Sequence, residues 1–189
     1  MIRSYEMNYE VDIAGYKKEL KLFKVSDDLQ IAAFILYGDV AVTRHAAKEL
    51  LARAPEFDIM LTSASKSIPL IYEMARQAGV NDYIVALKSQ KVYMGEPLSA
   101  PVNSITTFQQ QRIYIGEDDV EKMRGKRILI VDDVISTGQS LAALEKLAEG
   151  AGGNIVGKMA VLAEGDAYDR TDITVLGKLP LFDAEGNVL

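Results

Sequence analysis

The chain has 189 residues, of which 49% are hydrophobic and 25% charged, with 14 glycines and 5 prolines. This is the composition of an ordinary folded domain and excludes disordered and collagen-like chains; a chain of this length can bury a single core without a disulfide or metal. No cysteine and one histidine exclude thiolate catalysis and multi-histidine metal sites, and the net charge of −6 disfavours nucleic acid as a partner.

Two further features bear on the location of the protein. The longest unbroken apolar run, from Ile31 to Tyr37, is far shorter than the roughly 20 residues that a membrane helix needs. The N-terminus lacks the apolar core of a signal peptide. We therefore expect a cytoplasmic protein with no membrane partner.

The first predicted elements are two helices, one from about Ser26 and one from about Thr43. Apolar residues of the second recur at helical spacing: they are Ala46, Ala47, Leu50, Leu51 and Ala54. His45 lies within this pattern with no partner at catalytic spacing, so we predict that it packs and takes no part in chemistry.

A strand, a polar loop and a helix then occur twice. The first unit has a strand at 57–62, a loop at 63–67 and a helix that ends at Gly79, as a C-cap would. The second has a strand at 127–133, a loop at 136–140 and a helix that ends at the glycines of 150–153. Such units predict an α/β fold with a mostly parallel sheet flanked by helices.

Three more short runs rich in Val, Ile and Leu predict further strands, at 83–87, 155–162 and 172–176. No low-complexity linker or internal repeat divides the chain, which favours a single domain. Loops that leave the carboxyl ends of parallel strands meet at one edge of a sheet. We therefore expect the loops at 63–67 and 136–140 to share one site.

The segment from Ile128 to Ser140, with the sequence ILIVDDVISTGQS, carries the clearest chemistry. Four apolar residues predict a buried strand, and two carboxylates at its end, Asp132 and Asp133, are costly to bury unless they bind a cation or hydroxyl groups. The small residues that follow offer hydroxyls and backbone N–H groups where a helix begins, which is a ready anion site. Neither a P-loop nor a G-x-G-x-x-G motif is present.

At every position these 13 residues resemble the phosphoribosyl-pyrophosphate (PRPP) signature of type I phosphoribosyltransferases. The receiver domain of response regulators also has two acidic residues after a first strand, but that domain needs about 120 residues, and only 56 follow Asp133. The resemblance extends from about Asp39 to the C-terminus and is closest to the adenine and xanthine enzymes. It implies one domain over 1–189, with a core at about 39–165 and a small hood formed by about 1–38 and 166–189.

The resemblance also implies roles for individual residues. The catalytic pair would hold the ribose hydroxyls and Mg²⁺, directly or through water, and a loop would wrap the 5-phosphate; the pair is Asp132 and Asp133, and the loop is Ser136, Thr137, Gly138, Gln139 and Ser140. Pyrophosphate would bind Ser65, Lys66, Ser67 and Lys88, and the base would bind Val134 and Phe182. The segment from Asn103 to Arg112 resembles the hairpin that closes over the site.

The implied reaction transfers the 5-phosphoribosyl group from PRPP to a purine base, with adenine expected first and xanthine second, in a homodimer that uses Mg²⁺. The small residue Ser136 argues against hypoxanthine and guanine, because those enzymes usually have an acid there. Departures from the family pattern at Ala64, Ser67 and Leu87 bear on pyrophosphate binding. A PRPP-sensing regulatory module of the same fold is the alternative, since it would need the same signature.

Overall fold

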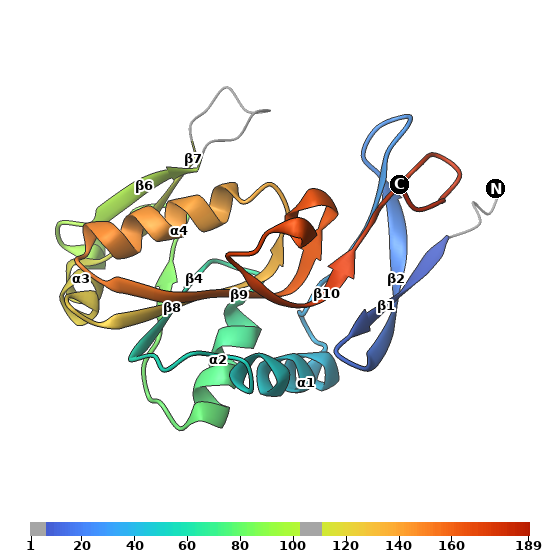
Figure 1. Ribbon diagram of the computed structural model, residues 1–189. Coiled ribbons are helices and arrows are strands. Elements are labelled where there is room, and N and C mark those ends of the chain that lie inside the picture. The colour runs from blue at the N-terminus through green and yellow to red at the C-terminus, as the bar shows by residue number, and fades with distance from the viewer. Residues whose placement is uncertain (1–6, 103–110) are drawn as a thin grey trace.

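The computed structural model describes residues 7–102 and 111–189, and its centre is a five-stranded parallel sheet (Figure 1). The strands lie in the order β10-β9-β8-β4-β5. Their bounds are Ile59–Ser63 for β4, Ile84–Ala86 for β5, Arg127–Ile135 for β8, Asn154–Glu164 for β9 and Thr174–Leu179 for β10. The predicted α/β class with a mostly parallel sheet is confirmed.

Helices cover both faces of this sheet (Figure 1). One face is covered by α1 (Val40–Leu51) and α2 (Ile68–Ala78), and the other by α4 (Gln139–Gly150). The hairpin of β6 (Leu98–Val102) and β7 (Gln111–Ile115) packs beside α4, and α3 (Glu117–Met123) follows it. Buried side chains accordingly form two apolar clusters.

Strand β8 lies in the middle of the sheet, and its four apolar residues, at 128–131, are fully buried. Strands buried on both faces read as continuous hydrophobic runs, which is why this segment could be predicted from its sequence. The strand extends through the two acidic residues to Ile135. The pair therefore lies at the carboxyl end of a rigid central element.

The chain reverses its direction of travel across the sheet between β4 and β8. It goes from β4 to β5 on one side, and later from β8 to β9 and β10 on the other. In open parallel sheets this switch point is where loops diverge and ligands bind. The two polar loops predicted to share a site follow these two neighbouring strands.

A second, antiparallel sheet lies at the end of the molecule where the C-terminus is found (Figure 1). It contains β1 (Asn8–Ile13), β2 (Tyr16–Lys24), β3 (Gln30–Ala32) and β11 (Leu181–Phe182) in the order β1-β2-β3-β11. Short 3-10 helices occur at Val92–Met94 (η1) and Gly165–Asp169 (η2). The sheet joins segments that are about 150 residues apart, as the pairing of Gln30 with Phe182 shows.

The prediction of a helix from about Ser26 is wrong. The chain there makes a tight turn, in which the N–H groups of Val25 and Ser26 donate to Leu29, and then enters β3. Ser-Asp-Asp suits a helix N-cap and a turn equally well, and the strand partners that decide between them are distant in sequence. The other predicted helix begins slightly earlier than expected, at Val40, because Asp39 caps it.

The remaining predicted strands are present with small shifts in their bounds. The segment at 83–87 forms β5 with Leu87 bridging to Tyr114, and the last two predicted strands are β9 and β10. Of the predicted closing hairpin, residues 103–110 lie outside the described part, whereas Arg112 lies in β7. In the described residues, no helix has both the length and the apolar character needed to cross a bilayer.

Candidate active site at the carboxyl ends of strands β4 and β8

The loop at 136–140 connects β8 to α4 and has the geometry of an anion site. Gly138 has a left-handed backbone (φ +75°) and caps α4, and its carbonyl accepts the first helical hydrogen bond, from Ala142. The side chains of Ser136, Thr137 and Ser140 are exposed. A cavity of about 100 Å³ is lined by this loop together with Asp132, Val134, Ile135 and Leu141. Hydroxyls and helix N-terminal N–H groups are thus available to a phosphate.

The two carboxylates before this loop are unusually buried, with only 6% of Asp132 and 6% of Asp133 exposed. Burial, and next the charge of Asp133, raises the pKa of Asp132 to about 7. One oxygen of Asp133, Oδ2, is buried without a hydrogen-bond partner among the described residues. A buried carboxylate oxygen without a partner costs stability, so the pair is arranged for a ligand.

Ser67 connects the loop after β4 to the acidic pair of β8. Its hydroxyl, 1% exposed, lies 2.6 Å from Oδ1 of Asp132, to which it donates, and 3.3 Å from Oδ1 of Asp133. Ser67 is also the residue that precedes α2, so the loop after β4 is fixed directly against the acidic pair. The loop after β4 therefore lies against the acidic pair, which directly precedes the 136–140 loop in the chain.

The rest of the loop after β4 is more open. Ser65 and Lys66 are exposed, and the Tyr37 hydroxyl donates to the Ser65 hydroxyl. The peptide bond between Ala64 and Ser65 is cis. Pro69 follows at the start of α2, where a missing N–H is harmless.

Lys88 lies close to this loop by strand register. The Ala64 N–H donates to Ala86 at 2.8 Å, and Ser63 pairs with Ala86, two residues before the exposed Lys88. Lys91 is exposed further along, at the start of the 3-10 helix η1.

The two residues predicted to contact a base differ in their placement. Val134 is half-buried and lines the cavity of the 136–140 loop. Phe182 is only 1% exposed, and its ring packs edge-on against Tyr9 at 5.0 Å. Phe182 is therefore a core residue of the structure, because β11 places it in the buried apolar cluster between the antiparallel sheet and the rest of the molecule.

Sequence reasoning missed three contacts around the site. They are the Ser67 bridge to the acidic pair, the Tyr37 bond to Ser65, and the position of Arg170, whose Nη1 would lie 2.6 Å from a Cβ placed on Gly138. All three join residues that are distant in sequence, so no local sequence pattern predicts them. The packing role predicted for His45 matches its place: its Nε2 donates to the Ile13 carbonyl at 2.8 Å, and its ring lies against Tyr16.

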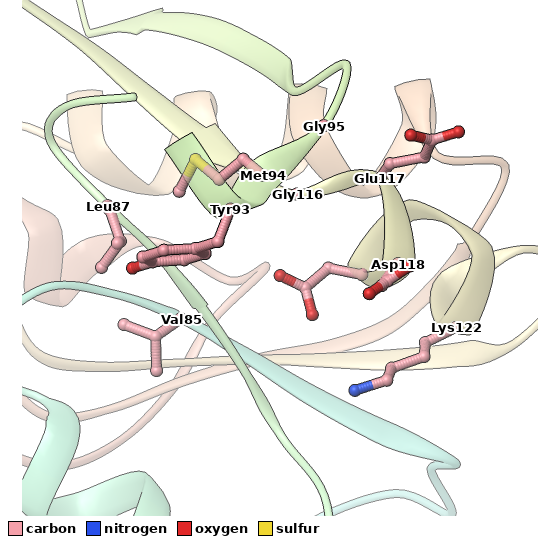
Figure 2. A pocket seen from close by; sticks show the side chains of 10 residues that line it. Val85, Leu87, Tyr93, Met94, Gly95, Gly116, Glu117, Asp118 and Lys122 are labelled. Atoms are coloured by element: carbon pink, nitrogen blue, oxygen red, sulfur yellow. The ribbon is translucent and has the colours of Figure 1, made fainter. Parts of the chain in front are cut away.

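A separate cavity of about 460 Å³ lies beside the edge strand β5 (Figure 2). Val85, Leu87 and Tyr93 form an apolar side, whereas Asp118 and Lys122 of α3 lie across from them. Among the described residues, its lining includes none of those predicted for PRPP or pyrophosphate. The candidate active site is therefore the one at β4 and β8.

Comparison with known families agrees with this arrangement. The model of the phosphoribosyl transferase domain matches residues 39–179, three quarters of the chain. The chain belongs to the phosphoribosyltransferase family. The matched residues include both loops, the acidic pair and the strands that hold them.

Individual relatives of this phosphoribosyltransferase carry the names of different purines. A hypoxanthine/guanine phosphoribosyltransferase of Methanococcus voltae is 35% identical over 113 residues, which are 60% of this chain and 56% of that protein. A xanthine phosphoribosyltransferase of Brevibacillus brevis is 34% identical over 54% of this chain and 45% of that protein. An adenine phosphoribosyltransferase of Corynebacterium jeikeium is 33% identical over 48% of this chain and 44% of that protein. The alignments thus span about half the length of these relatives.

Solved structures share the fold. Adenine phosphoribosyltransferase from Saccharomyces cerevisiae superposes with a TM-score of 0.66 at 20% identity, over 82% of this chain and 92% of that one. The enzyme from Thermoanaerobacter pseudethanolicus gives 0.62 at 24% identity, over 76% and 84%. The predicted type I phosphoribosyltransferase fold is confirmed.

Proposed function

We propose that this protein is a purine phosphoribosyltransferase, which transfers the 5-phosphoribosyl group of PRPP to a purine base and releases pyrophosphate. The observation that carries the proposal is the Ser67 contact with Asp132 and Asp133. It brings the polar loop after β4 to the buried acidic pair, and the 136–140 loop follows that pair directly in the chain. PRPP needs these three recognition elements.

Each part of PRPP has a matching group. The 5-phosphate would take N–H and hydroxyl donors of the 136–140 loop, and the ribose hydroxyls would donate to Asp132 and Asp133. Pyrophosphate would lie against Ser65, Lys66 and Ser67, with Lys88 nearby. In the reaction a ring nitrogen of the base forms a bond to carbon 1, the bond from carbon 1 to pyrophosphate breaks, and the nitrogen loses its proton. The protein's task is positioning and charge stabilisation.

The acidic pair also fits a magnesium ion. Carboxylate oxygens are the donors that Mg²⁺ prefers, and Oδ2 of Asp133 is buried without a partner among the described residues. When bound, the ion would neutralise charge on the departing pyrophosphate. The pair itself would fix the ribose, and its negative charge would stabilise positive charge that develops on the sugar ring.

For the base we propose adenine first and xanthine second. Ser136 is small, which suits these two bases on the family pattern, and Val134 lines the adjoining cavity. Relatives named for adenine, xanthine and hypoxanthine/guanine match at similar identity, so all four bases belong in the test. We also propose a cytoplasmic homodimer, on the family resemblance; light scattering after gel filtration measures its mass.

The direct test supplies PRPP and Mg²⁺ with adenine, xanthine, hypoxanthine or guanine and follows nucleotide and pyrophosphate. We expect one monophosphate to form with each accepted base, and Asp132→Asn with Asp133→Asn to abolish it. Failure with all four purine bases would overturn the proposed purine phosphoribosyltransferase activity. PRPP binding without turnover would then support the alternative, a PRPP-sensing module.

A further inference from the structure

A second cavity lies on the surface of α1 and α2, away from the acidic pair. Its volume is about 460 Å³, and it is lined by Ala41, Arg44, His45 and Lys48 of α1 and by Arg76 and Gln77 of α2. This volume is within the range of small-molecule sites, about 300 to 1,000 Å³. Three of the six lining side chains are cationic at neutral pH, and none is a carboxylate.

The carboxylate that lies near these cations is already occupied. Both oxygens of Glu73 accept hydrogen bonds from Arg76, at 2.7 and 2.8 Å, and Gln77 donates to one of them. Arg76 holds the pKa of Glu73 at about 2, with smaller contributions from Gln77 and Arg44. Glu73 therefore stays charged and has little capacity left for Arg44 and Lys48.

Arg44 and Lys48 form no ion pair within the described part of the chain. They are four residues apart on α1, where like charges lie side by side and repel. The last turn of a helix favours a cation, which accounts for Lys48. It does not account for Arg44, which lies nearer the start of α1, in a protein whose net charge is −6.

We propose that this cavity binds a small ligand that carries two or more phosphate groups, as a site separate from that for PRPP. Arg44 and Lys48 would contact the phosphates from α1, and Arg76, whose Nε and Nη2 already donate to Glu73, would approach them from α2. A nucleic acid is disfavoured by the negative charge of the whole molecule, whereas a ligand of nucleotide size would contact only the local cations. The proposal does not depend on the reaction proposed above.

The cavity is connected to the candidate active site through helix α2. Helix α2 begins directly after Ser67, and Arg76 lies nine residues further on, about 14 Å along the helix. Gln77 donates to the Arg44 carbonyl at 3.1 Å and ties α2 to α1. A ligand that bridges the two helices would therefore act on the same helix that positions Ser67 against the acidic pair.

Amide chemical shifts recorded while inorganic tripolyphosphate is added to the full chain would test the site. We expect saturable shifts at 41–48 and 76–77, distinct from any at 136–140. In the double variant Arg44→Gln with Lys48→Gln, the Kd measured from the shifts at 41–48 and 76–77 should rise roughly tenfold, because two charge-assisted contacts are lost. Any Kd measured from shifts at 136–140 should be unchanged. If the double variant does not fold, each single variant should show part of that loss.

The matched control removes two exposed lysines outside the cavity, with Lys126→Gln and Lys146→Gln, and should leave the shifts at α1 and α2 intact. Shifts confined to 136–140 would overturn the proposal. So would shifts at α1 and α2 that do not saturate by about 10 mM, a concentration too high for a specific site, or an equal loss in the control. Failure of PRPP turnover would leave this result unaffected, so the two proposals fail separately.

Discussion

At the scale of single residues, the central feature is a pair of carboxylates that the fold buries at a cost. Asp132 and Asp133 are each 6% exposed and directly follow four fully buried apolar residues of β8. Two adjacent negative charges in such a place are unfavourable until a cation or hydroxyl groups reach them. The Ser67 hydroxyl relieves part of this cost and at the same time orients the pair.

This arrangement predicts that Ser67→Ala weakens the binding of Mg-PRPP roughly tenfold, because a hydrogen bond to a charged group is worth about 1.5 to 3 kcal/mol. Calorimetric titration measures the Kd. Ser67→Thr retains the hydroxyl and should bind more tightly than the alanine variant. Equal affinity of wild type and Ser67→Ala would show that the contact does not position the pair.

The pKa of Asp132 predicts how stability depends on pH. It is raised to about 7 in the folded protein, so between about pH 4 and pH 7 the folded form retains a proton that the unfolded form has lost. Stability therefore falls as pH rises through this window. Asp132→Asn removes the effect, and at pH 8 it should be more stable than wild type by about 1 to 4 kcal/mol.

Urea unfolding of wild type and Asp132→Asn at pH 5 and pH 8 measures this difference. The advantage of the variant should be larger at pH 8, although it should bind PRPP less tightly. An advantage that is the same at both pH values would mean that Asp132 titrates normally.

Some of the site could be predicted from sequence and some could not, for a physical reason. The strand, the acidic pair and the 136–140 loop are contiguous, so their chemistry is visible in 13 residues. The Ser67 contact with Asp132 spans 65 residues and depends on β4 lying next to β8. Phe182 is a similar case, because its burial against Tyr9 follows from a sheet that no local pattern reveals.

At the scale of elements, the parallel sheet follows from local patterns, whereas the antiparallel sheet does not. Strand β3 has three residues and pairs with β2 and with β11, about 150 residues later. Its sequence also fits the start of a helix, so only the long-range pairing selects a strand. Strands buried on both faces, such as β8, have no comparable ambiguity.

The junction between the antiparallel sheet and the central sheet depends on a close approach of two strands. A Cβ on Gly177 of β10 would lie 2.3 Å from the Asp12 carbonyl of β1, and the Ala14 N–H donates to Leu176 at 3.3 Å. Gly177→Ala would push these strands apart and should cost about 1 to 3 kcal/mol. Thermal unfolding measures the loss.

Gly116→Ala is the matched control for this prediction. Gly116 has an ordinary φ of −75°, and a Cβ there would meet its nearest atom at 3.4 Å, which is normal contact. It should therefore lower the melting temperature much less than Gly177→Ala. Equal effects would show that the approach of β1 to β10 is not what Gly177 permits.

At the scale of the whole molecule, the net charge of −6 does not oppose a highly phosphorylated small ligand. In the proposed site, a phosphate would meet N–H groups and hydroxyls of the loops at 65–67 and 136–140 and the side chains of Lys66 and Lys88. Field effects from distant carboxylates are screened within about 10 Å at ordinary salt. Local groups therefore decide which anion binds, while the overall charge limits contact with long polyanions.

The last prediction measures that local recognition through global stability. Mg-PRPP at about 100 times its Kd should stabilise the folded chain by about 2.7 kcal/mol, and each kcal/mol raises the melting temperature by about 2 to 4 °C in a protein of this size. Asp132→Asn with Asp133→Asn should abolish the rise. Asp118→Asn with Asp119→Asn, an acidic pair beside the cavity in Figure 2, should retain it. If both double variants respond as wild type does, PRPP does not bind at the end of β8.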